Sequence, residues 1–313
     1  MPTDPHVVVF GPGPFVSITL EAAVTGADDD EIHIHAAGQG VWVARAAARL
    51  GARVTLVTTC GGEHGTVLGP LLTGEPFDVA IAEVAGEGAC YVDDRRTRDR
   101  TRIATRHADL LSRHELDDLY GAALSSGLGA DVAVLCGTGE AERLPADLYR
   151  RLATDLRVNG TPVVADLSGT FVEAALRGGL DVLKISQSEA LEVEGGSSTE
   201  LTDLIRTARR LMDRGAERVV LSRADDPAIA VDGEQVLELT APTLETADHR
   251  GAGDSMTAAL AIGVGAGEEW TSVLTRATAA GSANVTRHGL GTLWTSEIDA
   301  LQPRVRVTPL SGA

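Results

Sequence analysis

The sequence predicts an α/β protein with a doubly wound, mainly parallel sheet flanked by helices and a small β lid. Short β-branched apolar runs alternate with helical periodicity along most of the 313 residues. Glycine-containing turns separate several strands from the following helices. The alternation breaks between Phe77 and Thr105, where a charged segment divides two short strand candidates. We therefore expect one domain over residues 1–313, with a lid built from segments near 11–35 and 77–105.

The composition is typical of a soluble globular protein with an aliphatic core. Apolar residues make up 43%, charged residues 23% and aromatic residues only 3%. With 27 Lys and Arg against 45 Asp and Glu, the net charge is −18, which opposes non-specific binding to nucleic acid or to an anionic membrane. We therefore expect a small-molecule substrate, and neither a nucleic-acid nor a membrane partner.

The cysteines and the N-terminal segment indicate the cellular compartment in which the protein is expected. Cys60, Cys90 and Cys136 are odd in number and far apart, which argues against a disulfide framework or a zinc site. Residues 1–6 lack the basic and apolar runs of a signal peptide, and no apolar stretch reaches the length of a membrane span. These features predict a cytoplasmic protein.

The first strand, His6–Phe10, is a β-branched apolar run that ends in the rigid turn Gly-Pro-Gly-Pro. The alternation at 32–35 indicates a strand with one exposed face, and a Gly-Gln-Gly turn leads into an Ala-rich helix at 41–50. Similar patterns predict strands at 53–59, 132–136, 162–166, 182–185 and 218–221 and helices at 65–72, 148–158, 170–177 and 200–214. A capping box at Ser112 opens a helix that extends to Leu124.

Between 77 and 105, the runs 89–92 and 102–105 predict an exposed hairpin around an arginine-rich loop. Neighbouring aspartates make a merely solvated hairpin the simpler interpretation of its arginines. A second hairpin is expected at 228–231 and 235–239, turning at Asp232 and Gly233, and helices are expected at 255–262 and 270–285.

The stretch from Ala247 to Met256 combines small residues, flanking charge and a following helix. The backbone N–H groups of Gly251, Ala252 and Gly253 can close around an anion at the helix N-terminus. Asp254 beside them fits either an N-cap or a base that accepts a proton near the bound anion. Because short motifs arise often by chance, the turn taken alone is better explained as a capped helix.

The order of motifs resembles that of the ribokinase-like carbohydrate kinases, the phosphofructokinase B family, over nearly the whole chain. Residues 248–254 resemble D-T-x-G-A-G-D, Gly38-Gln39-Gly40 falls at G-G-K-G, and Lys184 to Glu189 falls at K-P-N-x-x-E. Asp166 to Gly169 resembles D-x-S-G, and Asn284 with Gly289 resembles the adenine-side helix and closing loop. The nearest branch is that of the 1-phosphofructokinases and tagatose-6-phosphate kinases.

The resemblance implies transfer of the γ-phosphoryl group of ATP to a hydroxyl of a sugar or sugar phosphate. Asp254 would be the base, and the backbone of Gly251, Ala252 and Gly253 would hold the developing charge. Mg²⁺ would bridge the phosphates, with Glu189 ordering its waters. Expected nucleotide-binding residues are Lys184, Ser186, Glu189, Ser222, Arg223, Arg250, Asn284 and Gly289. Expected acceptor-binding residues are Gly13, Phe15, Gly38, Gln39, Gly40, Trp42 and Arg102.

Two further expectations follow from the same resemblance. Asp248 matches a residue that helps to hold a monovalent cation such as K⁺ in many relatives, but the neighbouring Thr of the motif is His249 here, which weakens the case for this ion. The lid would serve to exclude water from the acceptor, and the chain would be a monomer or a homodimer formed through the lid.

The departures from the family pattern cluster on the acceptor side. The Asp of N-P-A-x-D is replaced around Phe15, and the Lys and Asn of G-G-K-G-x-N become Gln39 and Trp42. These changes argue against fructose 1-phosphate as the acceptor, because a charge-assisted contact to phosphate contributes about 1.5–3 kcal/mol. On the nucleotide side, Ser186 replaces the Asn of K-P-N, and Ala224 and Pro227 replace the glycines of S-x-G-x-x-G.

Three functions therefore stay open from the sequence. The intact turn from Gly251 to Asp254 favours an active kinase that acts on a sugar or sugar-like alcohol. Phe15 and Trp42 could instead stack on the base of a nucleoside. The altered residues Ser186, Ala224 and Pro227 suit a nucleotide- or sugar-binding regulatory protein that has lost turnover.

Overall fold

A computed structural model describes residues 4–23, 29–97, 100–139, 143–245, 249–287 and 289–310 of the chain. The large sheet runs in the order β14 (Arg306–Pro309), β13 (Gln235–Thr240), β12 (Asp226–Asp232), β11 (Ala216–Arg223), β10 (Leu180–Ser186), β9 (Val163–Asp166), β8 (Val132–Cys136), β1 (His6–Phe10), β4 (Arg53–Gly61) and β5 (Asp78–Val84). From β5 to β11 the neighbouring strands are parallel, whereas β12, β13 and β14 add an antiparallel edge. The mainly parallel sheet expected from the sequence is confirmed.

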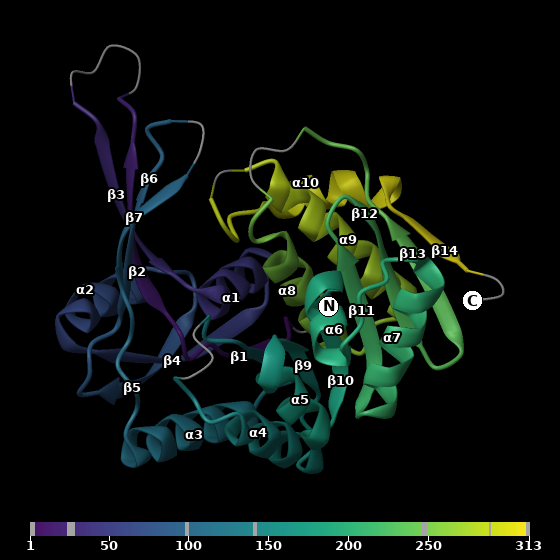
Figure 1. Cartoon of the computed structure of the whole chain (residues 1–313), viewed down its shortest axis with the longest axis horizontal. Helices are drawn as coiled ribbons and strands as arrows, with labels where there is room; N and C mark the ends of the chain where they lie inside the picture. The colour runs from purple at the N-terminus through teal and green to yellow at the C-terminus, as the bar shows by residue number, and fades with distance from the viewer. Residues whose placement is uncertain are drawn as a thin grey trace.

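The central strands of the large sheet, such as β1 and β8, are apolar on both sides, and helices cover both faces (Figure 1). The helices are α1 (Gln39–Arg49), α2 (Gly62–Thr73), α3 (Arg113–Gly127), α4 (Asp147–Val158), α5 (Gly169–Gly178), α6 (Gln187–Glu194), α7 (Leu201–Asp213), α8 (Ala252–Gly265), α9 (Trp270–Val285) and α10 (Thr295–Leu301), followed by a 3₁₀ turn (Gln302–Arg304). Alternate residues of β1 enter different cores: Val7 packs with α1, α8 and α9, and Val8 packs with α3, α4, α5 and α7. No helix among the described ranges is both long and apolar enough to cross a lipid bilayer.

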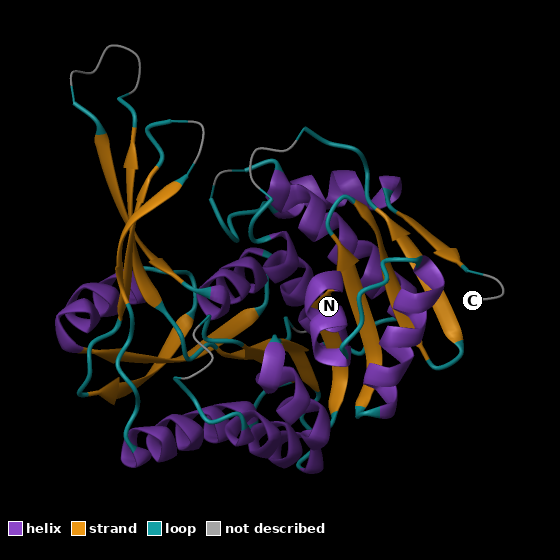
Figure 2. Ribbon diagram, viewed as in Figure 1, coloured by secondary structure: helices purple, strands orange, loops and turns teal. Residues whose placement is uncertain are grey.

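A second, smaller sheet projects from one end of the large sheet (Figure 2). It has the order β3 (Glu31–Ala37), β2 (Phe15–Glu21), β6 (Ala89–Asp94) and β7 (Thr101–Arg106). The register pairs Ser17 with His35 and with Tyr91, so these three side chains share one face of the small sheet. Val16 and Cys90 point the other way, toward the core around α2. We call this sheet the lid.

The structure corrects several expectations about elements. Residues 78–84 were placed in the lid, but β5 pairs in parallel with β4 at the edge of the large sheet, so only β6 and β7 of the 77–105 segment belong to the lid. Strands β2 and β14 and helices α6 and α10 were missed. Helix α8 begins at Ala252, three residues before the expected start at Ser255, which places Asp254 inside its first turn.

Candidate active site

The functional residues lie where the carboxyl ends of the parallel strands meet. Strand β1 is flanked by β4 on one side and β8 on the other, so the connections leave in opposite directions at this point. Ligands of doubly wound sheets bind in the crevice that such a reversal creates. The loops after β1, β8, β9, β10 and β11 and the N-termini of α1 and α8 surround this crevice.

The turn at Gly251 presents the open N-terminus of α8. Gly251 is the N-cap residue and has a φ of +76°, a left-handed conformation that glycine adopts without strain. The first intrahelical bond runs from Ser255 N to Gly251 O at 2.9 Å. The preceding N–H groups of Ala252, Gly253 and Asp254 therefore lie ahead of the helical ladder, where the helix dipole favours an anion. This geometry fits the predicted anion cradle.

A buried ion pair lies directly below this turn. Lys184 Nζ donates a 3.0 Å hydrogen bond to Asp166 Oδ2, and both side chains are less than a tenth exposed. Thr257 Oγ1 lies 2.7 Å from the same carboxylate oxygen and 2.9 Å from Gly253 O. A Cβ on Gly253 would lie 2.4 Å from Lys184 Nζ. The small residue at 253 thus lets the ammonium approach the backbone of the anion cradle.

Asp254 sits in a strongly perturbed environment. Burial is the largest effect and, together with the negative charges of Asp166 and Glu189, it raises the pKa of Asp254 to about 7, although Lys184 acts in the opposite direction. The residue as a whole is only partly exposed. A carboxylate with a pKa near the working pH is suited to accept a proton and release it again.

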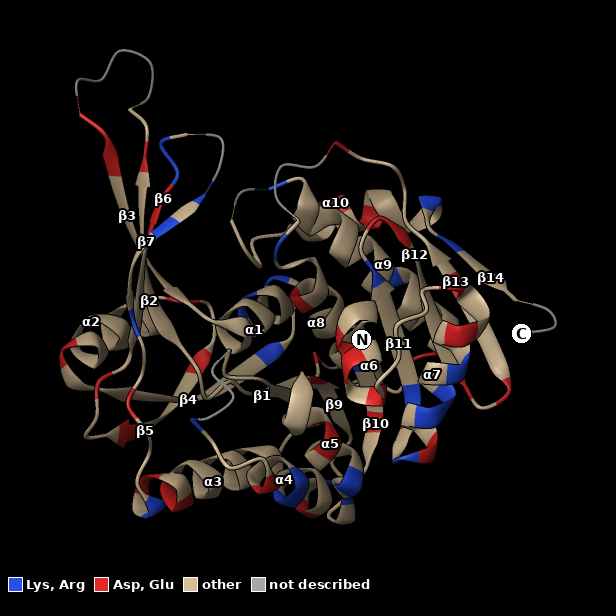
Figure 3. Ribbon diagram, in the orientation of Figure 1, with Lys and Arg blue, Asp and Glu red and all other residues tan. Residues whose placement is uncertain are grey.

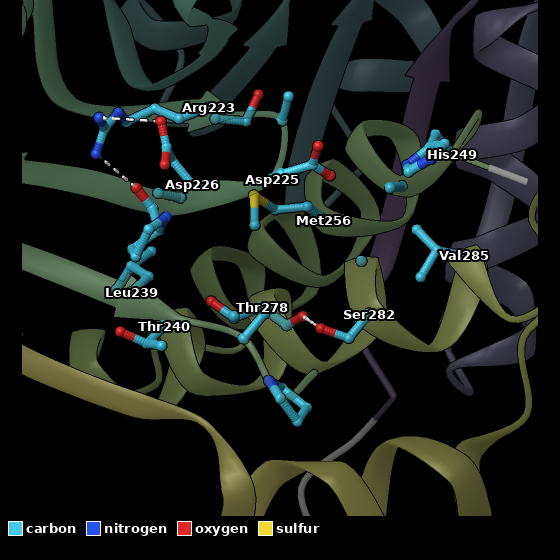
Figure 4. Close-up of a pocket in the computed structure, with 18 of the residues that line it drawn as sticks. Arg223, Asp225, Asp226, Leu239, Thr240, His249, Met256, Thr278, Ser282 and Val285 are labelled. Carbon is cyan, nitrogen blue, oxygen red and sulfur yellow. Dashed lines mark hydrogen bonds and ion pairs between the residues drawn. The ribbon is translucent and has the colours of Figure 1, made fainter. Parts of the chain in front are cut away.

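A pocket of about 460 Å³ opens beside the cradle (Figure 4). Its walls come from the loop after β11, from β13 with the segment that follows it, and from α8 and α9. Ser222, Arg223, His249 and Gly253 line it, while Leu239 and Met256 supply apolar surface. A cavity with apolar walls that ends at a helix N-terminus can accept the base and the phosphates of a nucleotide.

Two expected nucleotide-side residues form a helix cap instead of lining this pocket. The side chains of Ser186 and Glu189 make a capping box at the start of α6. Glu189 Oε2 accepts from Ser186 N at 3.0 Å and from Ser186 Oγ. Arg223 is held by Gln187, Asp226 and the carbonyl of Pro227 at the end of the pocket. Of the residues predicted for the nucleotide, only Ser222 and Arg223 line the pocket.

Asn284, expected on the nucleotide side, is directed into the protein. It is fully buried, and its amide binds protein groups rather than facing the pocket. Nδ2 donates to Arg250 O at 2.6 Å, and Oδ1 accepts from Gly291 N at 3.1 Å and from Ser255 Oγ at 3.2 Å. Arg250 and Gly289 are exposed and do not line the pocket. Asn284 therefore connects the turn at Arg250 with the loop at Gly291.

The acceptor-side glycines explain how the lid joins the sheet. A Cβ on Gly40 would lie 2.4 Å from Gly11 Cα, and a Cβ on Gly13 would lie 2.5 Å from Thr138 O. Gly38 has a φ of +125° and faces the carbonyl of Gly13. The backbone segment after β1 thus contacts the start of α1 and the segment after β8 directly. Because these glycines have no side chain, only their backbone groups could contact a substrate.

Side chains at the acceptor side form an aromatic cluster. The ring of Phe15 lies 6.0 Å from that of Trp42 and 4.7 Å from that of Tyr91, both edge to face. The guanidinium of Arg102 lies 4.1 Å from the centre of the Tyr91 ring, and its Nε donates to Asp93 at 3.0 Å. Asp93 also pairs with Arg100, and Figure 3 shows basic and acidic residues together on this part of the lid.

Gln39 replaces the lysine expected at its position and has a partner. Its Oε1 accepts from Gly137 N at 2.7 Å. Asp248, expected to contact a monovalent cation, lies outside the described residues. Within the described ranges, no group of three His, Cys, Asp or Glu side chains is arranged to bind a metal ion directly.

Comparisons with known proteins agree with this geometry. The model of the pfkB family carbohydrate kinases matches residues 6–297. The chain belongs to this family. An ATP-dependent 6-phosphofructokinase isozyme 2 of Mycobacterium tuberculosis is 29% identical over 79% of this chain and 73% of its own. A 1-phosphofructokinase of Bacillus subtilis is 27% identical over 87% and 88%.

Solved structures show the same fold. Phosphofructokinase-2 from Escherichia coli in complex with potassium superposes with a TM-score of 0.84 at 23% identity, covering 96% of this chain and 99% of its own. Ribokinase from Arabidopsis thaliana with ribose and ATP gives a TM-score of 0.73 at 17% identity, covering 96% and 99%. As a pfkB family member, the chain is a sugar or sugar-phosphate kinase, a phosphotransferase that uses ATP and acts on a hydroxyl group.

Two residues of the site were missed in the sequence. Thr257 supports Asp166 and follows Asp254 by three positions, one turn along α8. Tyr91 lies in a predicted strand, but only the lid register places it beside Phe15. A helical projection from Asp254 would have found Thr257, whereas no local signal indicates the partner of Tyr91.

Proposed function

We propose that this kinase transfers the γ-phosphoryl group of ATP to a hydroxyl of a sugar-like alcohol, with Asp254 as the base. The supporting observation is the place of Asp254 in the first turn of α8 beside Lys184, where burial raises the pKa of its carboxyl to about 7. In the proposed reaction the carboxylate accepts the hydroxyl proton as the oxygen attacks the γ-phosphorus. The N–H groups of Gly251, Ala252 and Gly253 stabilise charge on the transferred phosphoryl oxygens.

The nucleotide would occupy the pocket beside Gly253, with its phosphates directed toward Lys184. Mg²⁺ would supply charge neutralisation on the phosphates. Both hydrogen bonds of Glu189 to Ser186 use Oε2, so Oε1 can accept a water that the ion holds. Asp248 and K⁺ remain part of this proposal, to be examined by comparing activity in potassium and in tetramethylammonium salts.

We propose an unphosphorylated acceptor. Gln39, where relatives carry a lysine, is neutral and bound to Gly137, and the side chains of Phe15, Trp42 and Tyr91 fill the neighbouring surface. Arg102 is the cation nearest to these rings among the interactions described, and Asp93 offsets its charge. Such a surface suits hydroxyl groups and a flat apolar moiety better than a phosphate. This observation also favours a nucleoside as the second candidate.

One assay separates these candidates. ADP release is measured with panels of free sugars, sugar phosphates and nucleosides, using wild type and Asp254→Asn. Selective turnover of free sugars supports the main proposal, turnover of nucleosides supports the second, and turnover of sugar phosphates overturns the argument from Gln39. Tight binding of Mg-ATP without transfer to any acceptor would identify the regulatory binder instead.

We also propose that the chain acts as one kinase domain with its lid, and that the lid can join two copies. Ile32, Ile34 and Ile103 on the lid strands are 65%, 46% and 54% exposed. Exposed large apolar side chains on both edge strands of a projecting sheet suit an interface surface. Because neither face of a lone lid is covered by helices along its outer part, a second lid would bury these residues in a homodimer.

A further inference from the structure

Arg45 of α1 connects three segments that are far apart in the sequence. Its Nε donates to Glu75 Oε2 at 2.8 Å, and its Nη2 contacts the other oxygen of that carboxylate. Nη1 donates to Leu290 O at 2.9 Å, and Nη2 donates to Ala36 O at 3.2 Å. The side chains of Arg45 and Glu75 are only 13% and 16% exposed. All three guanidinium nitrogens are therefore engaged, in an orientation that a planar fork fixes.

The first end of this connection is the base of the lid. Ala36 is the penultimate residue of β3, two residues before Gly38, where the chain turns into α1. Trp42 on α1 contacts Phe15 of β2. A Cβ on Gly291 would lie 2.6 Å from Trp42 O, so the loop at 289–291 packs directly on α1. Movement of the lid strand at Ala36 would thus act on the guanidinium that holds Leu290.

The other end is the anion cradle. Next to Leu290, Gly291 N donates to Asn284 Oδ1, and Asn284 Nδ2 donates to the carbonyl of Arg250. A Cβ on Gly251 would lie 3.1 Å from Asn284 Nδ2 and 3.3 Å from Leu290 Cδ2. Leu290 and the buried amide of Asn284 therefore pack against Gly251, the residue whose conformation opens the N-terminus of α8.

We propose that Arg45 is a positioning residue that couples the base of the lid to the anion cradle through Leu290, Gly291 and Asn284. It touches neither the pocket nor Asp254, so its effect passes through the loop. Stabilisation of a transferred phosphoryl group depends on donors held within a few tenths of an ångström of their place. Only the kinetic part of the test below rests on the proposed function.

Hydrogen exchange measured by mass spectrometry tests the coupling without any substrate. Arg45→Lys keeps the charge but cannot hold Glu75 and two carbonyls together. We expect amide exchange at 250–255, which Arg45 does not contact, to rise at least about fivefold, together with a rise at 289–291. Arg49→Lys is the matched control: it lies one turn further along α1, and its guanidinium lies 5.3 Å from the Trp294 ring centre. It should leave both segments unchanged.

Asn284→Ala tests the route. This variant should raise exchange at 250–255 by itself, and adding Arg45→Lys should then raise it no further than about twofold. If Arg45→Lys alters exchange only near Ala36 and Leu290, or if the two substitutions act additively at 250–255, the coupling is refuted. Glu75→Gln, which preserves shape and removes one charge, should give a smaller rise in the same segments and serves if Arg45→Lys fails to fold.

Kinetics supply the final test. With the best acceptor of the panel, Arg45→Lys should lower kcat about 10- to 100-fold while KM for ATP changes by less than about threefold. A loss confined to KM would contradict a positioning role. If wild type transfers phosphate to no acceptor, the proposed function fails, whereas the exchange results still decide the coupling.

Discussion

Lys184 and Asp166 form a 3.0 Å ion pair below the first turn of α8, and Asp254 lies within its electrostatic field. Two carboxylates therefore share the influence of one ammonium in a buried site. Asp166 accepts the hydrogen bond from the ammonium, whereas burial and neighbouring negative charges raise the pKa of Asp254 to about 7. Asp254 is therefore the carboxylate of this site that is suited to accept and release a proton near neutral pH.

The first prediction concerns the pH dependence of activity. Because the base must be ionised, kcat/KM should fall about tenfold per pH unit below pH 7 and level off above it. Asp166→Asn removes a negative charge that raises the pKa of Asp254, so the midpoint should move to lower pH. Initial rates in a constant-ionic-strength buffer series measure both. Proteins are usually most stable between roughly pH 5 and 8. A plot of kcat/KM against pH that is flat from about pH 5.5 to 8 would contradict the assignment of the base.

The second prediction sets activity against stability. Asp254→Asn should lose about 100- to 10,000-fold in kcat. Since the folded-state pKa of Asp254 lies above its ordinary value of 3.8, the folded protein binds an extra proton between about pH 4 and 7, and wild-type stability falls as pH rises through this window. The variant does not lose stability in this way. Its free energy of unfolding, measured with urea at pH 8, should therefore exceed that of wild type by an amount on the order of 1–2 kcal/mol. Lower stability of the variant at pH 8 would be the contrary result.

The third prediction tests the space at Gly253. A Cβ there meets Lys184 Nζ at 2.4 Å, so Gly253→Ala should displace the ammonium or the turn and lower kcat at least about tenfold. Gly121→Ala is the control, because a Cβ at this α3 position meets nothing within 4 Å. It should retain activity and gain about 0.5–1 kcal/mol in stability. Equal activities of the two variants would show that the contact is unimportant.

The fourth prediction concerns Ala224, which stands where the resembled motif S-x-G-x-x-G has glycine. Its φ of +51° makes it the non-glycine residue with positive φ among the described positions. A left-handed alanine costs about 1–2 kcal/mol, which the greater chain entropy of glycine offsets in part. Ala224→Gly should therefore raise stability by up to about 1 kcal/mol, measured by thermal unfolding. A clear loss of stability would show that the turn is relaxed around alanine.

The fifth prediction concerns assembly. If the lid joins two copies, Ile34→Asp should shift the chain from dimer to monomer in light scattering, because a buried unpaired carboxylate is costly. Leu128→Asp is the matched control, since Leu128 is similarly exposed at 47% but lies at the end of α3. A monomeric wild type, or dissociation by both variants, would refute the lid interface.

The sequence predicted the parallel core well because strands buried on both faces are continuous apolar runs, as in Val132–Cys136. Strand β5 was misplaced because an edge strand is half exposed, and its sequence alternates like a lid strand. The turn before α8 was predicted from its small residues, of which Gly251 adopts a positive φ, where glycine has few substitutes.

Roles that depend on side-chain direction could not be predicted in the same way. An amide such as Asn284 can bind a ligand or a carbonyl, and only its burial against Arg250 decides between them. Ser186 and Glu189 did carry a local signal, because Ser-x-x-Glu before a helix is a capping box. Interpreting the pair as an altered ligand motif hid its part in starting α6.

The crossing of Gly11 with Gly40, and of Gly13 with Thr138, limits how this enzyme can be redesigned. Substitutions at Gly11, Gly13 and Gly40 cannot reshape the acceptor side, since an added Cβ would separate the backbones that meet where lid and sheet join. Variation directed at Phe15, Trp42 and Tyr91 leaves this junction intact. New acceptor preferences should therefore be sought by substituting these three aromatic side chains while the glycine backbone beneath them stays unchanged.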